Sequence, residues 1–376
     1  MSLREQIEKE IREHGPIPFS RYMELCLYDP VEGYYSRNSE QFGKAGDFYT
    51  SSDVHAVFGR LLARQFEEMW RALNRPPGLE ILELGPGRGL FARDVLDWSR
   101  DKFPDFFDAL TYTLHESSPA LRARLTQTLD RHISTGKAVL PALPKTSQEM
   151  SPSGSSLIVF ANEFFDALPV EILSPSGKLH LAFENNRLTE IWLRPAAEEL
   201  AFLDRYSVHP EGEERVEVPL AGQRWAASIA RAINRGFLVI IDYGYTRSEQ
   251  LAGRHRGTLM TYRQHRATVN PYEAPGEQDV TAHVNFTALG AALEKADMRT
   301  QRLVTQSQFL MGLGEPTQFA DAFERCRLPQ ERAKVVLQLK HLVSPAGMGE
   351  TFRVLTASRG VKPEEVAALS GLRFAI

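Results

Sequence analysis

The fold is decided by one stretch of the sequence, Ile81-Leu82-Glu83-Leu84-Gly85-Pro86-Gly87-Arg88-Gly89. Its first half has the apolar character of a short buried strand, its second half is a glycine-rich turn, and helical spacing of apolar residues follows from Leu90. Glycines let the backbone turn sharply and approach a ligand closely, and the N-terminus of the next helix offers free N–H groups. The stretch therefore predicts a ligand-binding turn at the carboxyl end of a strand.

Strands and helices alternate on either side of this turn. Strands are predicted over residues 79–84, 111–116, 156–161 and 237–242, with helices over 90–100 and 119–131. Short apolar strands that alternate with helices form a parallel sheet covered on both faces. The sequence therefore predicts a doubly wound α/β core.

The best domain boundary is Pro76-Pro77-Gly78, which ends a long predicted helix. Residues 1–77 are predicted to form an N-terminal helical region and residues 78–376 the core. Three inserts are expected in the core. They are a β-hairpin region at about 170–220, a segment without clear periodicity at about 245–280, and a helical segment at about 307–345.

Composition excludes several classes of protein. The 376 residues carry 44 Lys+Arg against 48 Asp+Glu, a formal net charge of −4, which argues against a protein whose main task is to neutralise nucleic-acid phosphates. Cys26 and Cys326 are the only cysteines, so a disulfide framework and a thiolate zinc site are excluded. We expect no nucleic-acid partner.

The sequence also shows no recognisable targeting peptide, membrane span or metal-binding motif. The longest apolar runs, such as 237–241, are far shorter than the ~20 residues that a membrane span requires. The acidic first helix is neither a signal nor a transit peptide, so a cytoplasmic location is the expectation. His255, His265 and His283 lack metal-ligand spacing, so no metal is expected, although His265 could act as a base in a pocket.

The acid before the glycines helps to distinguish between the classes of ligand that such a turn can bind. Leu90 occupies the third glycine position of the dinucleotide fingerprint, so an NAD site is a poor fit. Glu83, two residues before the first glycine, and Glu116, at the end of the next strand, match the pattern of class I S-adenosylmethionine (SAM) methyltransferases. In that pattern the first acid supports the methionine end of SAM and the second the ribose hydroxyls. The alternative for each is a solvated strand end.

A second polar cluster follows the next long strand, in Asn162-Glu163-Phe164-Phe165-Asp166-Ala167-Leu168-Pro169. Carboxylates beside a methyl donor suit a cationic nucleophile such as arginine, and Glu163 and Asp166 could hold its guanidinium and take up its proton. The alternative, compatible with this one, is that they cap a following helix. Tyr243 or Tyr245, after another core strand, could wall the pocket.

Segments along nearly the whole chain resemble one family, that of MidA and the mitochondrial complex I assembly arginine methyltransferase. The matching segments are 19–23 (FSRYM), 27–30 (LYDP), 33–35 (GYY), 46–50 (GDFYT), 58–59 (FG), 83–89 (ELGPGRG), 161–163 (ANE), 166–169 (DALP), 242–244 (DYG), 257–259 (GTL), 275–276 (PG), 279–284 (DVTAHV), 305–306 (TQ), 309–310 (FL) and 348–350 (MGE). Two positions depart from the family pattern, Ser52-Asp53 in place of Pro-Glu and Asn270 in place of Asp before Pro271.

The resemblance implies a seven-stranded class I methyltransferase core, SAM as methyl donor with S-adenosylhomocysteine as product, and an N-terminal lid over the SAM site. Asn162, Glu163 and Asp166 are then the catalytic residues. The residues implied for SAM are Asp47, Thr50, Glu83, Gly85, Pro86, Gly87, Gly89, Glu116, Ser117 and Asn162.

The function predicted on this basis is methylation of a protein arginine, in a subunit of respiratory complex I or a similar protein. Two alternatives stay open. One is a SAM-dependent enzyme that methylates a small molecule. The other is an assembly factor that binds SAM without turnover, which the long inserts at 170–220 and 245–280 favour. The sequence leaves the oligomeric state open.

Overall fold

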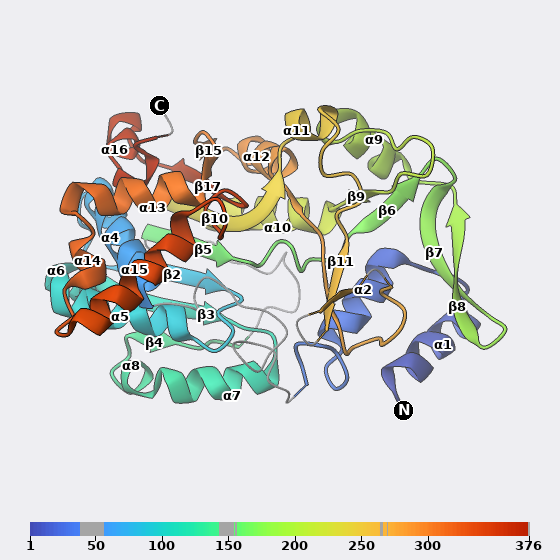
Figure 1. The fold of residues 1–376 in the computed structure, drawn as a ribbon, viewed down its shortest axis with the longest axis horizontal. Helices are drawn as coiled ribbons and strands as arrows, with labels where there is room; N and C mark the ends of the chain where they lie inside the picture. Colours follow the sequence, from blue (N-terminus) through green and yellow to red (C-terminus); the bar gives the residue numbers. More distant parts are fainter. Residues whose placement is uncertain (38–55, 143–153, 155, 264–265, 269, 375–376) are drawn as a thin grey trace.

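Two lobes, each built on a β-sheet with its own helices, lie side by side in the computed structural model (Figure 1), which describes residues 1–37, 56–142, 154, 156–263, 266–268 and 270–374. The larger sheet holds the glycine-rich turn. The smaller sheet holds the predicted hairpin insert and is covered by the N-terminal helices.

The larger sheet has nine strands in the described part of the chain. Its main path runs β15, β17, β10, β5, β2, β3, β4, with β14 beside β10 and β16 beside β17. Strands β2, β3, β4, β5 and β10 are parallel, and β17 runs antiparallel to β10. The strands are β2 (Leu79–Leu84), β3 (Leu110–His115), β4 (Ala138–Val139), β5 (Ser156–Asn162), β10 (Gly236–Tyr245), β14 (Val284–Asn285), β15 (Arg299–Thr300), β16 (Val304–Thr305) and β17 (Phe352–Arg359).

Helices cover both faces of this sheet. Helices α4 and α5 lie against one face, where α13 and α15 pack beside α4 and α13 also contacts β16 and β17, and α10 and α12 lie against the other face. The helices of this lobe are α4 (Ala56–Ala72), α5 (Leu90–Lys102), α6 (Pro104–Ala109), α7 (Pro119–Thr128), α8 (Asp130–Ser134), α10 (Leu220–Ala232), α12 (Phe286–Lys295), α13 (Gln306–Gly314), α14 (Ala320–Phe323), α15 (Pro329–Val343) and α16 (Pro363–Ala367), with the short 3₁₀ turns η2 (Glu315–Thr317) and η3 (Ser370–Leu372).

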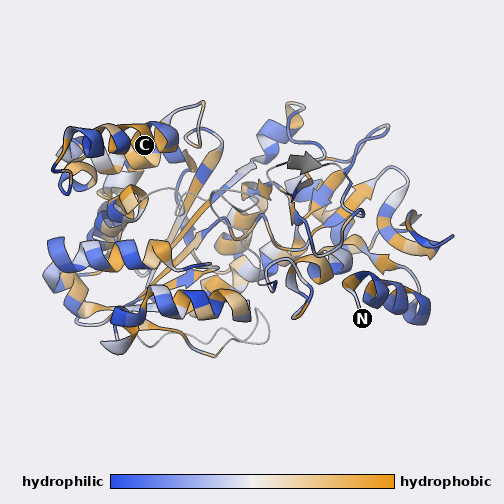
Figure 2. Ribbon diagram, turned by 60° about the horizontal axis from the view of Figure 1, so that its bottom comes forward, coloured by the Kyte–Doolittle hydropathy of each residue, from blue (hydrophilic) through white to orange (hydrophobic). Residues whose placement is uncertain are grey.

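Hydropathy follows this layering. Six of the seven residues of β5 are buried, which a strand covered on both faces requires, and its sequence is apolar throughout its middle. The helices carry apolar residues on the faces turned toward the sheet and polar residues outward (Figure 2). The predicted α/β fold is confirmed as a mixed sheet with helices on both faces.

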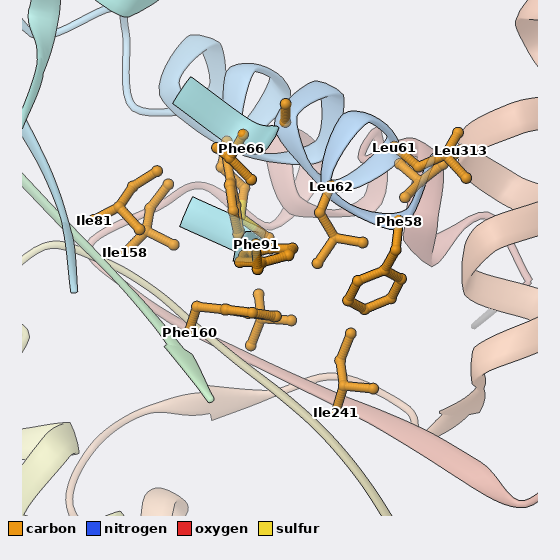
Figure 3. Packing of buried hydrophobic residues seen from close by; sticks show 14 of the residues in the cluster. Phe58, Leu61, Leu62, Phe66, Ile81, Phe91, Ile158, Phe160, Ile241 and Leu313 are labelled. Atoms are coloured by element: carbon orange, nitrogen blue, oxygen red, sulfur yellow. The ribbon is translucent and has the colours of Figure 1, made fainter. Parts of the chain in front are cut away.

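Aromatic side chains form the centre of the core between this sheet and α4 and α5. The Phe160 ring from β5 stacks on the Phe91 ring, with 4.5 Å between centroids, and meets the edge of Phe66 at 5.6 Å (Figure 3). All three side chains are buried. The contact fixes α4 and α5 to the middle of the sheet.

The smaller sheet is built from the predicted hairpin insert. Asn185 and Asn186 join β7 to β8 with φ of 49° and 62°, the two positive values that a tight hairpin turn needs. Its strands are β1 (Ile17–Pro18), β6 (Glu171–Ser174), β7 (Gly177–Glu184), β8 (Arg187–Leu193) and β9 (Val216–Val218), and its helices are α1 (Leu3–His14), α2 (Phe19–Tyr28) and α9 (Ala197–Tyr206).

The segment at 245–280, whose sequence shows no clear periodicity, contains short elements of secondary structure. It contains α11 (Arg247–Leu251), β11 (Met260–Arg263), β12 (Arg266–Thr268) and the start of β13 (Asp279–Thr281), and the three strands pair as a small antiparallel sheet. Strands of three or four residues are too short to show a period of two. They pair with one another within residues 260–281, so the small sheet is local to this segment.

The N-terminal residues divide between the two lobes. Helix α1 buries Leu3, Ile7 and Ile11 in the cluster of the smaller sheet, and β1 pairs with β7, whereas α4 packs on the larger sheet. The predicted N-terminal lid is therefore not confirmed. Its central part, residues 46–50 with Asp47 and Thr50, lies outside the described residues, as do Ser52 and Asp53.

We find no helix in the described residues that combines the length and the apolar character needed to cross a bilayer.

Truncation of the central aromatic should be costly. We expect Phe160→Ala to lower the free energy of unfolding by about 3–5 kcal/mol, because a cavity remains between Phe66 and Phe91. Urea denaturation measures this change. Leu337→Ala, at a position 68% exposed on α15, is the control and should change stability by under about 0.5 kcal/mol. Equal losses in both variants would contradict the assignment of Phe160 to the core centre.

Candidate active site

The carboxyl ends of four strands meet at one edge of the larger sheet. In the strand pairing, Leu84 at the end of β2 lies next to His115 of β3 and Ala161 of β5, and Ile241 of β10 lies next to Asn162. The glycine turn, Glu116, the Asn162 cluster and Asp242 therefore share this edge. Ligands of open α/β sheets bind at such edges.

Three glycines shape the turn after β2. Gly85, Gly87 and Gly89 have φ of 65°, 54° and 74°, a left-handed backbone that favours glycine. A Cβ on Gly85 would lie 3.2 Å from the Phe164 ring, and one on Gly89 would lie 3.2 Å from Leu125. Pro86 is buried between them. The turn is thus a close-approach loop that leads straight into α5.

Glu116 joins this turn to the end of β3. One of its carboxylate oxygens accepts a hydrogen bond from the Gly87 N–H at 3.1 Å and the other from the Ser118 N–H at 2.9 Å. The side chain is 5% exposed, and burial raises its pKa to about 7. Ser117, between the two, is exposed. Glu116 is not a solvated strand end.

Glu83 lies inside β2, where the structure buries it. It is 4% exposed and accepts a hydrogen bond from the Tyr112 hydroxyl at 2.8 Å. Burial raises its pKa to about 8, and the charge of Glu116 adds to the effect. The alternative of a solvated strand end is therefore wrong for Glu83 as well.

The turn after β5 is locally strained. Glu163 has φ of 51°, an uncommon value for a residue other than glycine, and such strain gathers at functional sites. The Asn162 side-chain N–H donates to the Glu163 carboxylate at 3.0 Å. The amide oxygen of Asn162 is buried and has no hydrogen-bond partner.

Asp166 also presents a buried oxygen without a partner. Its Oδ2 accepts a hydrogen bond from the Tyr243 hydroxyl at 2.6 Å, whereas its Oδ1 has none. The side chain is 6% exposed, and burial raises its pKa to about 6. The helix-capping alternative is wrong, because residues 163–168 form bends and a turn and the next element is β6.

Asp242 holds this turn in place. Its Oδ2 accepts hydrogen bonds from the Phe165 and Asp166 N–H groups at 3.0 and 3.3 Å. The side chain has no exposed surface, and burial raises its pKa well above the ordinary value, with the charges of Asp166 and Glu163 adding to the effect. The sequence offered one signal for it, an acid that directly follows the apolar run 237–241.

Residues from the other lobe and the chain start border the same edge, which sequence reasoning missed. The Tyr28 hydroxyl donates to the Ala167 carbonyl at 2.9 Å, and the Tyr35 hydroxyl donates to Asp279 at 3.0 Å. The Ser118 hydroxyl donates to the Tyr35 carbonyl at 2.5 Å. The sequence signal for these tyrosines was the family resemblance of segments 27–30 and 33–35, which did not name them as site residues.

The other candidates separate into two groups. Tyr243 lies at the site through its bond to Asp166, whereas Tyr245 stacks on His255, with 5.2 Å between ring centroids. His283 pairs with His255 at 3.2 Å, and His265 lies outside the described residues. Among residues that the structure describes, no group of three or more His, Cys, Asp or Glu side chains could hold a metal ion.

A cavity of about 420 Å³ in the smaller lobe contains none of the predicted catalytic residues. It is lined by Ile172, Glu190, Arg215, Glu217, Gly257, Leu259, Asn270, Pro271 and Tyr272. Asn270, where the family usually has Asp, therefore lies in this cavity wall rather than among the acids at the sheet edge.

The residues at the edge fit a cationic cofactor that carries a ribose and an amino-acid end. In the described ranges, the contacts of Glu83 and Asp166 are hydrogen bonds from tyrosine hydroxyls rather than ion pairs, and Asp166 Oδ1 has no partner, so a positive charge on a ligand would be favoured beside them. Glu116 offers acceptor oxygens to hydroxyl groups beside the close-approach loop. These are the groups that SAM presents.

This fold and this edge define a SAM-dependent methyltransferase. The chain belongs to the family of S-adenosyl-L-methionine-dependent methyltransferases, whose family model matches residues 61–304. The resemblance drawn from the sequence motifs is thereby confirmed, and so is SAM as the cofactor.

Curated relatives match almost the whole chain. A Drosophila melanogaster protein named "Protein arginine methyltransferase NDUFAF7 homolog, mitochondrial" is 30% identical over 393 residues, covering 96% of this chain and 85% of its own. The Homo sapiens protein named "Protein arginine methyltransferase NDUFAF7, mitochondrial" is 27% identical over 370 residues, covering 91% and 80%.

Two solved structures from Burkholderia thailandensis are also similar. One, bound to S-adenosyl-homocysteine, is 27% identical with a TM-score of 0.82 and covers 98% of this chain and 94% of its own. The other, a native crystal structure, is 28% identical with a TM-score of 0.80 and covers 98% and 93%.

The expected cytoplasmic location is wrong on this comparison. The curated relatives from fly and human are named as mitochondrial proteins. The missing transit-peptide pattern was too weak a ground for that expectation.

The glycine turn should tolerate no branched side chain. We expect Gly87→Val to weaken SAM binding at least about tenfold, because valine disfavours the left-handed backbone that aims the Gly87 N–H at Glu116. Isothermal titration calorimetry on folded protein measures the change. Gly136→Val is the matched control, since Gly136 has φ of 71°, lies after α8, and a Cβ added there would meet no atom within 4 Å. Unchanged SAM affinity in Gly87→Val would remove the turn from the cofactor site.

The buried acid Glu83 should make stability depend on pH. Its pKa is about 8 in the folded protein against an ordinary value of 4.5, so the folded state binds the proton more tightly than the unfolded state. The ligand-free protein should therefore lose stability as pH rises from 4.5 to about 8, by up to about 1.4 kcal/mol per pH unit from this group. Urea denaturation across this range should show a flatter dependence for Glu83→Gln. The same slope in both proteins would contradict the raised pKa.

Proposed function

We propose that this methyltransferase transfers a methyl group to an arginine side chain of a protein. One observation carries the proposal, the two buried oxygens without partners, Asn162 Oδ1 and Asp166 Oδ1, in one turn of the site. Buried acceptor oxygens normally accept a hydrogen bond, and these two could accept one from a bound substrate. A guanidinium brings five N–H donors and a permanent positive charge, which suits an acidic turn.

The roles of the acids follow from the chemistry of the acceptor. A guanidinium nitrogen needs its lone pair for the transfer, so the group must be oriented and must lose a proton. Glu163 and Asp166 would hold the guanidinium together with Asn162. Asp166, with a pKa of about 6, is ionised in most molecules at neutral pH and can accept that proton. Bound SAM supplies the methyl group.

For the cofactor, we propose that the glycine turn and the two strand-end acids hold SAM. The residues assigned to it are Glu83, Gly85, Pro86, Gly87, Gly89, Glu116, Ser117 and Asn162, together with Asp47 and Thr50 outside the described residues. Their support is the shared edge of the sheet and the bond between Glu116 and the Gly87 N–H.

The finer fold assignment is part of the proposal. We propose that the main path of seven strands is the class I methyltransferase core, with residues 78–376 as the core with its inserts. We propose further that part of the region 1–77 closes over the cofactor side. In support, Tyr28 and Tyr35 contact residues that flank the site.

The acceptor protein is proposed from the relatives and the motif resemblance. The fly and human relatives are named protein arginine methyltransferases, which supports arginine as the acceptor here. The resemblance to the complex I assembly family supports a subunit of respiratory complex I, or a similar protein, as the partner.

Two other functions are separable by one experiment. An enzyme for a small molecule would leave methyl label on a metabolite, and an assembly factor without turnover would bind SAM and its partner without label on either. Tandem mass spectrometry of cells with and without the gene, supported by labelled SAM in extracts, distinguishes them. We expect methylarginine that depends on the gene; label confined to lysine or metabolites would overturn the arginine assignment.

Neutral replacement of the acids should separate binding from transfer. We expect Glu163→Gln and Asp166→Asn each to retain SAM affinity within about twofold and to lose methyl transfer by about a hundredfold or more, because the amides cannot take the guanidinium proton. Calorimetry and transfer of labelled methyl groups to the acceptor measure the two effects. Glu184→Gln, at an exposed position at the end of β7, is the control. Transfer at the wild-type rate in both site variants would refute the role of this turn.

A further inference from the structure

We propose that Tyr243 is a positioning residue for methyl transfer, whose hydroxyl fixes one oxygen of Asp166 so that the other is left for the acceptor. The inference rests on the proposed function, because it assumes that Asp166 receives the guanidinium. It gives a role in the reaction to a residue of β10 that the sequence suggested only as part of the pocket wall.

The hydrogen bond between Tyr243 and Asp166 is short, and it engages only one of the two carboxylate oxygens. The Tyr243 hydroxyl donates to Asp166 Oδ2 at 2.6 Å, and Oδ1 is buried without a partner. The phenol hydroxyl therefore occupies Oδ2 of Asp166 and leaves Oδ1 as the oxygen that can accept another hydrogen bond.

Asp242 fixes both ends of this contact. Its Oδ2 accepts from the Asp166 N–H at 3.3 Å, and its Oδ1 accepts from the Tyr243 N–H at 2.9 Å. One buried carboxylate therefore ties the backbone of the donor to the backbone of the acceptor. The two backbones cannot shift relative to each other without breaking a bond to Asp242.

Packing holds the Tyr243 ring in the same orientation. The ring meets Phe352 edge-on with 5.6 Å between centroids, and Tyr243 pairs with Phe352 across β10 and β17. His283 meets the ring from the other lobe, with 5.2 Å between centroids. A phenol held by strand pairing and two rings has little freedom to turn away from Asp166.

The bond has an electrostatic consequence that can be measured. A hydrogen bond donated to the ionised carboxylate lowers the pKa of Asp166, in opposition to the larger effect of burial. Loss of the phenol hydroxyl should therefore raise that pKa. The other titratable groups that face Asp166 or share its surroundings are Tyr28, Tyr35, Glu163, Asp242, Tyr262, Asp279 and His283.

The test is the pH dependence of the single-turnover rate of methyl transfer. In the wild-type enzyme this rate should rise with pH as Asp166 ionises. In Tyr243→Phe we expect the rising limb to move to higher pH by about one unit, with SAM affinity unchanged. Replacement of Tyr243 by 3-fluorotyrosine, whose phenol is more acidic and a stronger donor, should move the limb to lower pH. A residue that only packs would give neither shift.

Tyr245→Phe is the matched control. It removes a buried phenol hydroxyl from the same strand, and Tyr245 is hydrogen-bonded to Gln250 rather than to Asp166. Its pH profile should equal that of the wild type. A profile of Tyr243→Phe that matches this control, or a shift of the 3-fluorotyrosine enzyme in the same direction as the phenylalanine variant, would overturn the proposal.

Failure of the proposed function gives a different result. If Asp166→Asn transfers methyl groups at the wild-type rate, Asp166 is not the base. Both the role proposed for Asp166 and the positioning role of Tyr243 are then wrong. If Asp166→Asn loses transfer and Tyr243→Phe keeps the wild-type pH profile of the single-turnover rate, only the positioning role of Tyr243 is wrong.

Discussion

A carboxylate without exposed surface connects the two strands that bear the reacting side of the site. Asp242 accepts hydrogen bonds from the turn after β5 and from its own neighbour on β10, so one buried acid joins the Asp166 turn to β10. Burial makes this acid resist ionisation, and nearby carboxylates add to that resistance. The edge of the sheet is consequently held together by backbone donors rather than by ion pairs.

This arrangement gathers four buried acids that the free protein does not keep fully ionised. Glu83, Glu116, Asp166 and Asp242 are each at most 6% exposed, and all have raised pKa values. A cationic ligand that enters would favour the ionised forms and so stabilise the folded state. The whole chain carries a formal charge of only −4, so the acidity is a local property of one edge. The composition alone conceals it.

Sequence patterns predicted the strands of the larger sheet well, because β2, β3, β5 and β10 are apolar runs ended by glycine or acid. The acids at their ends were found for the same reason. The strands within 245–280 were missed, since runs of three or four residues are too short to show a period of two. Tyr28 and Tyr35 were missed because only the tertiary fold brings an N-terminal segment beside Ala167 and Asp279.

The pairing of β1 with β7 sets an order for biosynthesis. Ile17 lies opposite Leu181, and the cluster that buries α1 and α2 also contains Val280 and Ala282. The apolar faces of the first helices to leave the ribosome therefore become fully covered only after more than half of the chain has been synthesised. During that interval Leu3, Ile7 and Ile11 are exposed on an amphipathic helix, a surface of the kind that chaperones bind during synthesis.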